Sequence, residues 1–220
     1  MQGGIFDSLT GQRPRDSYYR LPSAGEMSRQ PAYASHVGWS KSRGENTAAF
    51  GVGGYFGRQY WPYEHNVSAW AVTADWLVPI TNRFEVSGEF YRGRAIGGLG
   101  GGGGESVVAL GPVSDPASRY VGLDALGGWA QLKFKPAPMW EFNTAFGQDN
   151  PYASQLRAGN TVPSLFYPVP SLRNRSWFTN FIYRPRSDLV LSLEYRRIHT
   201  FESSSDQTTG HVNASVGVLF

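Results

Sequence analysis

The chain contains no cysteine among its 220 residues. A disulfide framework and a thiolate metal site are therefore both excluded. The four histidines do not have the spacing of metal ligands. We accordingly predict no metal site and no cofactor.

Long apolar runs are also missing. No stretch of 18 apolar residues is present that could span a membrane as a helix. The first twenty residues, MQGGIFDSLTGQRPRDSYYR, lack the apolar run of a secretory signal. These two features leave a soluble protein, or one that crosses a membrane as strands.

Basic residues form no block, although the net charge is +3 and the pI is about 9.2. Lysine and arginine alternate with aspartate and glutamate, whereas a protein that follows a phosphate backbone concentrates its positive charge. We therefore expect no nucleic-acid partner.

Aromatic residues and glycine are what the chain has in quantity. Aromatics make up 15% of the residues, yet only 40% are hydrophobic, which is little for a thick buried interior. The 27 glycines and 14 prolines divide the sequence into short pieces separated by turns. This composition favours an all-β fold.

Period-two alternation is the main pattern along the chain. In RFEVSGEFYRG, Phe84, Val86 and Phe90 share one face of an extended segment, while Glu85 and Glu89 share the other. About nine segments of roughly ten residues, the length of a tilted membrane strand, show this pattern or a weaker form of it. They are 32–41, 47–57, 66–78, 83–93, 130–136, 139–148, 175–185, 188–197 and 211–220.

The connections between these segments alternate in length. Short turns are expected at 42–45, 79–82, 136–138 and 185–187, and long loops at 57–65, 94–123, 149–172 and 202–208. Membrane barrels show this arrangement, with the short turns facing the periplasm. The pattern predicts an antiparallel up-and-down transmembrane β-barrel.

The C-terminal stretch VNASVGVLF ends on phenylalanine, with apolar residues at alternate positions before it. In this it resembles the outer-membrane β-barrel proteins of Gram-negative bacteria, and it is most similar to porin-like channels. The resemblance implies a place in the bacterial outer membrane, with the lipid bilayer and the barrel-insertion machinery as partners. It leaves the oligomeric state open. The residues that would carry the insertion signal are Val212, Ala214, Val216, Val218 and Phe220.

The direction of the strands suggests an incomplete barrel. The last strand is expected to descend toward the short turns. Because nine strands are predicted, the first of them also descends, whereas single-chain barrels usually have an even number of strands. We therefore expect residues 31–220 to be the C-terminal strands of a larger barrel. Residues 1–30 are expected to form an extracellular loop or an irregular N-terminal segment.

The polar face of the predicted strands would line a pore for passive diffusion of small polar solutes. A turn centred on Ala137 would place Lys133 opposite Glu141, and the strand of Glu85 should lie beside that of Lys133. These charges would either satisfy one another or form a transverse field that sorts solutes, and the mixture of signs predicts no preference for anions or cations. The predicted lining residues are Asp75, Glu85, Glu89, Gln131, Lys133, Lys135, Glu141, Asn143, Asn180, Arg184, Glu194 and Arg196.

The loops contain two further candidates. The run Gly100–Gly104 lacks the GK[ST] of a phosphate-binding loop, so we expect a flexible outer loop. Asp149, Asn150, Tyr152 and the stretch SLFYPVP are candidates for a constriction or plug.

Two other classes of protein fit parts of the sequence. A soluble carbohydrate-binding β-sandwich would use exposed tryptophan and tyrosine to stack on sugars. An outer-membrane hydrolase would need a serine, a histidine and an acid at one rim, but no GxSxG motif is present, and we predict no enzyme. Its candidate residues are His199, Ser203, Ser204, Ser205, Asp206 and His211.

Overall fold

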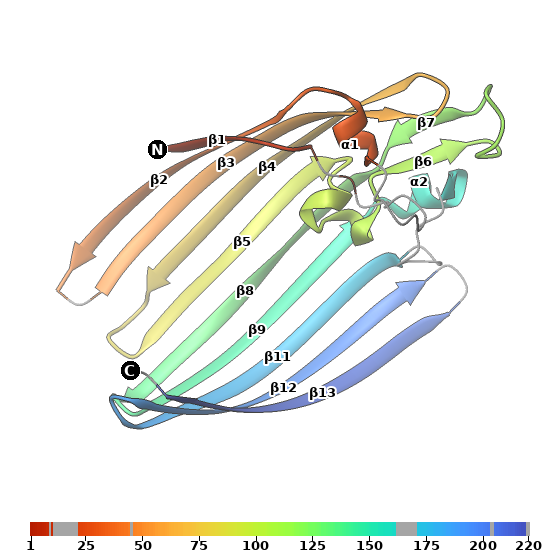
Figure 1. Ribbon diagram of the computed structural model, residues 1–220. Helices are drawn as coiled ribbons and strands as arrows, with labels where there is room; N and C mark the ends of the chain where they lie inside the picture. The colour runs from red at the N-terminus through yellow and green to blue at the C-terminus, as the bar shows by residue number, and fades with distance from the viewer. Residues whose placement is uncertain (9, 11–21, 45, 162–170, 203–204, 219–220) are drawn as a thin grey trace.

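The computed structural model describes residues 1–8, 10, 22–44, 46–161, 171–202 and 205–218. Ten strands form one antiparallel sheet in the order β1-β2-β3-β4-β5-β8-β9-β11-β12-β13, so that neighbours in the chain are neighbours in the sheet (Figure 1). The strands are β1 (Gln2–Phe6), β2 (Ala32–Arg43), β3 (Asn46–Trp61), β4 (His65–Pro79), β5 (Phe84–Arg94), β8 (Asp124–Ala137), β9 (Trp140–Pro151), β11 (Ser171–Arg186), β12 (Leu189–Glu202) and β13 (Asp206–Val218).

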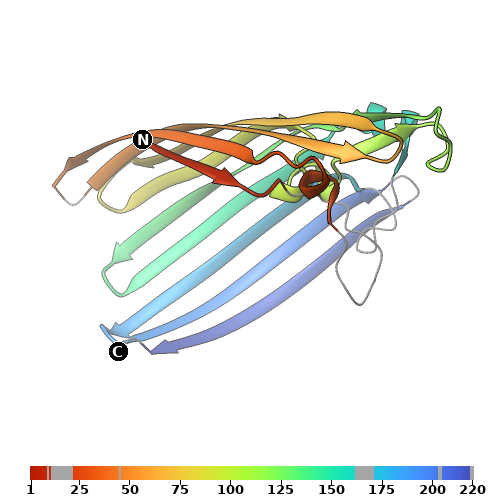
Figure 2. The same cartoon turned by 45° about the horizontal axis from the view of Figure 1, so that its top comes forward.

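Within the described residues, each of the nine alternating segments lies in a strand of this sheet to within one residue at its ends, which confirms the prediction of an antiparallel up-and-down β fold. The sheet curls into a trough, with β1–β3 along one side and β11–β13 along the other (Figure 2). Among the described residues β1 and β13 are edge strands that do not pair with each other, so the trough is open.

The two ends of the trough differ as the connections predicted. At one end, which we call the short-turn rim, β8 and β9 are joined by two residues, 138–139, and β11 and β12 by 187–188. The opposite end, the loop rim, carries the segment 95–123 between β5 and β8. Val218, the last residue of β13, pairs with Leu189 and thus lies at the short-turn rim.

Two connections predicted as long are short. For the loop expected at 202–208, β12 runs to Glu202 and β13 begins at Asp206, so only 203–205 lie between them. The segment 57–65 was expected to be a loop, but β3 and β4 continue through most of it and only residues 62–64 join them. The reason is that the ends of β3 and β4 pack into a small hydrophobic cluster at the loop rim. This cluster contains Trp61, Val67, Ala69, Ala95, Val107, Ala109 and Tyr120.

A second, three-stranded sheet caps the loop rim. It has the order β10-β6-β7, from Asn160–Thr161, Val107–Leu110 and Arg119–Gly122. The hydroxyl of Tyr120 donates a hydrogen bond to the carbonyl of Val113 at 3.1 Å, and burial raises the pKa of Tyr120, with a smaller contribution from Tyr63. The remaining short elements are η1 (Gly97–Leu99), η2 (Gly102–Gly104) and α2 (Ala153–Ala158).

The segment 1–30, expected to be a loop or irregular, contains two short elements. Strand β1 pairs with the part of β2 nearest the loop rim, from Ala32 to His36. Helix α1 (Ala24–Met27) begins with a capping box, in which the Ser23 amide donates to Glu26 at 2.7 Å and the Glu26 amide donates to the Ser23 hydroxyl at 3.3 Å.

Candidate pore lining

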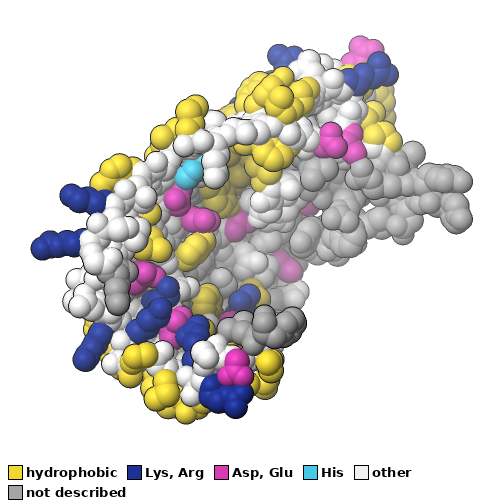
Figure 3. Space-filling view, turned by 60° about the vertical axis from the view of Figure 1, so that its left-hand side comes forward, with side chains coloured by type: hydrophobic (Ala, Val, Ile, Leu, Met, Phe, Trp, Pro, Cys, Tyr) yellow, Lys and Arg dark blue, Asp and Glu magenta, His cyan; other side chains and the backbone are white. Residues whose placement is uncertain are grey.

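All twelve predicted lining residues lie on one face of the sheet. The register shows this directly: Glu85, Lys133, Asn143, Asn180, Glu194 and Asn213 are successive partners across β5, β8, β9, β11, β12 and β13. Directly opposed residues of an antiparallel sheet point to the same side. We call this side the polar face. Figure 3 shows charged side chains of both signs gathered in the hollow of the trough.

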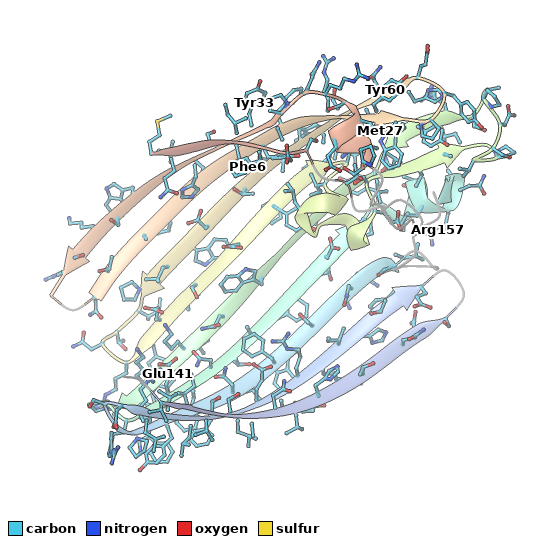
Figure 4. The ribbon with its side chains drawn as sticks, viewed as in Figure 1. Phe6, Met27, Tyr33, Tyr60, Glu141 and Arg157 are labelled. Atoms are coloured by element: carbon cyan, nitrogen blue, oxygen red, sulfur yellow. The ribbon has the colours of Figure 1, made fainter. Side chains whose placement is uncertain are left out.

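The charges nearest the short-turn rim are paired. The Lys133 ammonium lies 2.5 Å from Glu85 Oε1, as expected from their neighbouring strands. Glu141, only 8% exposed, accepts from Arg184 at 3.3 Å and lies 3.5 Å from the ammonium of Lys135 (Figure 4). Each carboxylate of this group therefore has a cation from an adjacent strand.

The expectation that Lys133 faces Glu141 is wrong. Lys133 is opposite Asn143, and Phe134 is opposite Phe142. The register shifts between Phe134 and Ala137, so that Ala137 pairs with Trp140 and the turn consists of 138–139. This irregularity inserts one extra residue into β8 beside the turn, which a sequence of alternating residues does not reveal.

Amide side chains continue the lining along the strands. Asn143 donates from Nδ2 to Glu141 at 3.0 Å and to Asn180 at 2.9 Å, while its Oδ1 accepts from Gln131 at 3.1 Å. Asn143 is only 5% exposed, yet its donors and acceptor are satisfied. The four side chains thus form a fixed polar layer over β8, β9 and β11.

Glu194 and Arg196 extend this layer onto β12. They form an ion pair of 3.2 Å, and Asn213 of β13 donates to Glu194 at 3.5 Å. On the other side, Glu89 accepts from the indole N–H of Trp129 at 3.1 Å. Sequence reasoning did not include Trp129 and Asn213 in the lining, although each alternates with apolar-face residues of its own strand.

Asp75 has a partner that sequence reasoning missed. It is directly opposite Glu89, an unfavourable like-charge pairing, but His36 Nε2 donates to its carboxylate at 2.7 Å. His36 lies on β2 and Asp75 on β4, so the contact crosses the intervening strand β3 at Gly51. A Cβ at Gly51 would lie 2.3 Å from His36 Nε2 and 2.4 Å from Asp75 Oδ2. The missing side chain at Gly51 is what allows the two groups to meet.

The glycine-rich loop folds against the polar face near the loop rim. Asp149 accepts from the amides of Gly102 at 3.0 Å and Gly103 at 2.5 Å, and also from the hydroxyl of Tyr91. Gly102 and Gly103 have φ of +67° and +64°, which other residues rarely adopt. Asp149 therefore holds these residues against the polar face, while the flexibility of the loop stays a prediction. The stretch SLFYPVP, at 164–170, lies outside the described residues.

The opposite side of the sheet, the apolar face, carries aromatic side chains in two rows. Near the short-turn rim, Phe84 stacks on Phe134 with ring centroids 4.4 Å apart, and Trp140 on Tyr183 at 4.3 Å. Nearer the loop rim are five aromatics that are 40–51% exposed, which we call the loop-side girdle: Phe56, Phe90, Phe146, Trp177 and Tyr195. Tyr33 and Tyr60, on the same face of β2 and β3, also point away from the trough (Figure 4).

The proposed insertion residues Val212, Ala214, Val216 and Val218 lie on the apolar face of β13, opposite Tyr195, Leu193, Leu191 and Leu189. Val216 is 74% and Val212 71% exposed. Phe220 lies outside the described residues.

Of the described residues of the hydrolase alternative, only His199 and Asp206 come together. His199 and His211 lie on opposite faces of the sheet, since Arg196 pairs with His211 and Thr208 with His199. Asp206 lies 3.7 Å from His199, and the Ser205 hydroxyl donates to Glu202 at 3.2 Å. Ser203 and Ser204 lie outside the described residues.

The described residues contain neither a cluster of metal ligands nor a membrane-spanning helix. Nowhere in these ranges do three or more His, Cys, Asp or Glu side chains come together as metal ligands. Likewise, the part of the chain that the structure covers contains no helix long and apolar enough to cross a membrane.

The fold is similar to that of a known channel. The crystal structure of the outer membrane channel DcaP of Acinetobacter baumannii superposes with a TM-score of 0.75 at 10% sequence identity. The match covers 99% of this chain and 57% of that chain, so this chain spans a little over half the length of the channel. No family model and no curated protein matches the sequence.

Proposed function

We propose that the chain forms part of the wall of a bacterial outer-membrane channel, through which small polar solutes diffuse passively. One observation carries the proposal: a single sheet has a continuous hydrogen-bonded polar face and, on its other side, an apolar face whose aromatic side chains remain exposed. A soluble protein buries such a face, whereas a barrel presents it to lipid.

The exposure of the apolar face weighs against a carbohydrate-binding sandwich. In a sandwich a second sheet covers the apolar face. Among the described residues the second sheet has only three short strands and sits at the loop rim. Val72, Phe142 and Leu193, which lie on the apolar face farther from that rim, are 43–52% exposed.

The open edges support a further part of the proposal, that the sheet belongs to a larger closed barrel. The β2 residues from Val37 to Arg43 pair only with β3 among the described strands, and β13 is exposed along its whole length. Unpaired backbone groups are costly in lipid, so additional strands must pair with these edges. We propose that the lipid bilayer and the insertion machinery, acting through β13, are the partners.

Ion conduction tests the channel function. The protein, purified in detergent and added to a planar lipid bilayer, should give discrete conductance steps. Asp149→Ala should raise the step size or the open-channel noise, because it frees the loop at Gly102 and Gly103 from the hollow. Asn150→Ala is the matched control, since it changes the next residue of β9 on the opposite face. Absence of steps from protein that has entered the bilayer would refute the proposal.

A further inference from the structure

Four arginines occupy equivalent positions on the apolar face, just beyond the loop-side girdle. Along β3 and β5, Arg58 follows Phe56 and Arg92 follows Phe90 by two residues toward the loop rim. Along β11 and β12, Arg175 and Arg197 stand in the same relation to Trp177 and Tyr195. A step of two residues keeps the side chain on the same face and moves it about 7 Å along the strand. We call Arg58, Arg92, Arg175 and Arg197 the arginine belt.

The height of the belt agrees with the edge of a bilayer core. Each belt residue is eight positions from an apolar residue close to the short-turn rim: Phe50 for Arg58, Phe84 for Arg92, Tyr183 for Arg175 and Leu189 for Arg197. Eight residues extend about 27 Å along a strand, or about 20 Å along the membrane normal at the usual tilt, and the apolar band of a barrel is about 25 Å tall. The belt therefore lies near the loop-side edge of the apolar band, from which a long arginine side chain can reach the headgroups.

The belt residues form no ion pair within the described residues, although the charge of Arg92 acts on the carboxylate of Asp124, which Arg94 holds. The ion pairs of the described residues include Arg94 with Asp124 and Arg196 with Glu194, but none of the four belt residues. Arg175 donates to the amide oxygen of Gln148 at 2.7 Å, and Arg92 donates to the hydroxyl of Tyr152, so both are oriented by neutral groups. Arg58 and Arg197 are exposed. Their positive charges thus remain available to an external anion.

We propose that the arginine belt binds the phosphate groups of anionic membrane lipids on the loop side of the bilayer. A guanidinium group forms paired hydrogen bonds with phosphate, and its aliphatic stem can lie along apolar surface while its head reaches the headgroups. Repetition of the same position on four strands, from both sides of the sheet, fits an extended anionic layer better than a single soluble ligand. The inference rests on the proposed membrane location.

The test compares lipid binding by the wild-type protein and by the fourfold variant Arg58→Gln, Arg92→Gln, Arg175→Gln and Arg197→Gln. Each protein is titrated in a zwitterionic detergent with phosphatidic acid or with phosphatidylcholine, and bound lipid is counted by native mass spectrometry. Each arginine is expected to contribute about fivefold to the affinity for an anionic lipid. The fourfold variant should therefore bind phosphatidic acid at least a hundredfold more weakly, with its affinity for phosphatidylcholine unchanged. The single Arg197→Gln should lose about fivefold.

Arg196→Gln is the matched control, because it removes an arginine from the adjacent position of β12 on the polar face. It should retain phosphatidic acid binding. Equal affinity of the wild-type and fourfold proteins for phosphatidic acid, with equal strand content by circular dichroism, would overturn the proposal. Equal losses of phosphatidic acid affinity in Arg196→Gln and Arg197→Gln would also overturn it. These two single variants can be compared even if the fourfold variant does not fold. Failure of the wild-type protein to enter phosphatidylcholine vesicles would instead refute the membrane location itself.

Discussion

At the scale of single residues, small side chains determine which polar groups meet. Gly51 lies between His36 and Asp75 and, having no side chain, allows them to form a hydrogen bond. This contact offsets the unfavourable position of Asp75 opposite Glu89. Asp149 acts similarly, since one carboxylate receives two glycine amides and a tyrosine hydroxyl. Such contacts depend on the close approach of the groups. Substitutions that prevent this approach should therefore lower the stability of the fold.

Gly51→Ala should lower the free energy of unfolding by about 1–3 kcal/mol, because the added methyl group displaces both His36 and Asp75. Gly54→Ala on the same strand is the control, since its Cβ would meet no atom closer than 4.0 Å. Urea titration of the protein refolded into detergent micelles measures both. Equal stability of the two variants would show that the His36–Asp75 contact does not constrain β3.

At the scale of elements, the turn between β8 and β9 sets the charge pairing. The shifted register next to Ala137 brings Lys135, rather than Lys133, within 3.5 Å of Glu141, and Arg184 reaches the same carboxylate from β11. Three strands therefore share one buried anion. Removal of this anion would leave two cations, about half exposed, on the polar face near the short-turn rim.

Glu141→Gln should make the channel more selective for anions, because Lys135 and Arg184 lose their counter-charge while the hydrogen bond to Asn143 can be retained. The reversal potential in a potassium chloride gradient measures the change. Asp188→Asn removes a carboxylate from the same rim, but from the turn at 187–188, where Arg186 lowers the pKa of Asp188 through a paired hydrogen bond. A shift as large in Asp188→Asn as in Glu141→Gln would contradict a role for the lining.

At the scale of the whole molecule, the two faces of the sheet require two different solvents. The polar face satisfies its own charges, while the apolar face exposes side chains such as Leu193, at 49%, among the described residues. Tyr33 and Tyr60 of this face point away from the trough, so the curl of the sheet does not cover the apolar face (Figure 4). Lipid on one side and water on the other is the arrangement in which both faces are stable.

Leu193→Lys should destabilise the membrane-inserted protein by about 2–4 kcal/mol, the cost of lysine on the lipid-facing side of a barrel near the bilayer centre. Ser192→Lys, one residue away on the polar face, should cost much less. Folding into phosphatidylcholine vesicles, followed by the shift of the folded band in unheated gels, measures both. Equal folding of the two variants would mean that the apolar face does not contact hydrocarbon.

The sequence by itself determined nine strands of the large sheet, their order and the identity of the two faces, because alternation and turn length are local properties of the chain; it did not predict β1 or the second sheet. It predicted that the strand of Glu85 lies beside that of Lys133, and it placed the predicted lining residues near Glu141 on one face of the sheet. It did not predict the partner of Glu141, the contact across Gly51 or the fold of the glycine-rich loop. The tertiary structure decided these, because a register shift, a methyl-sized gap and a carboxylate facing two amides exist only once strands distant in sequence are side by side.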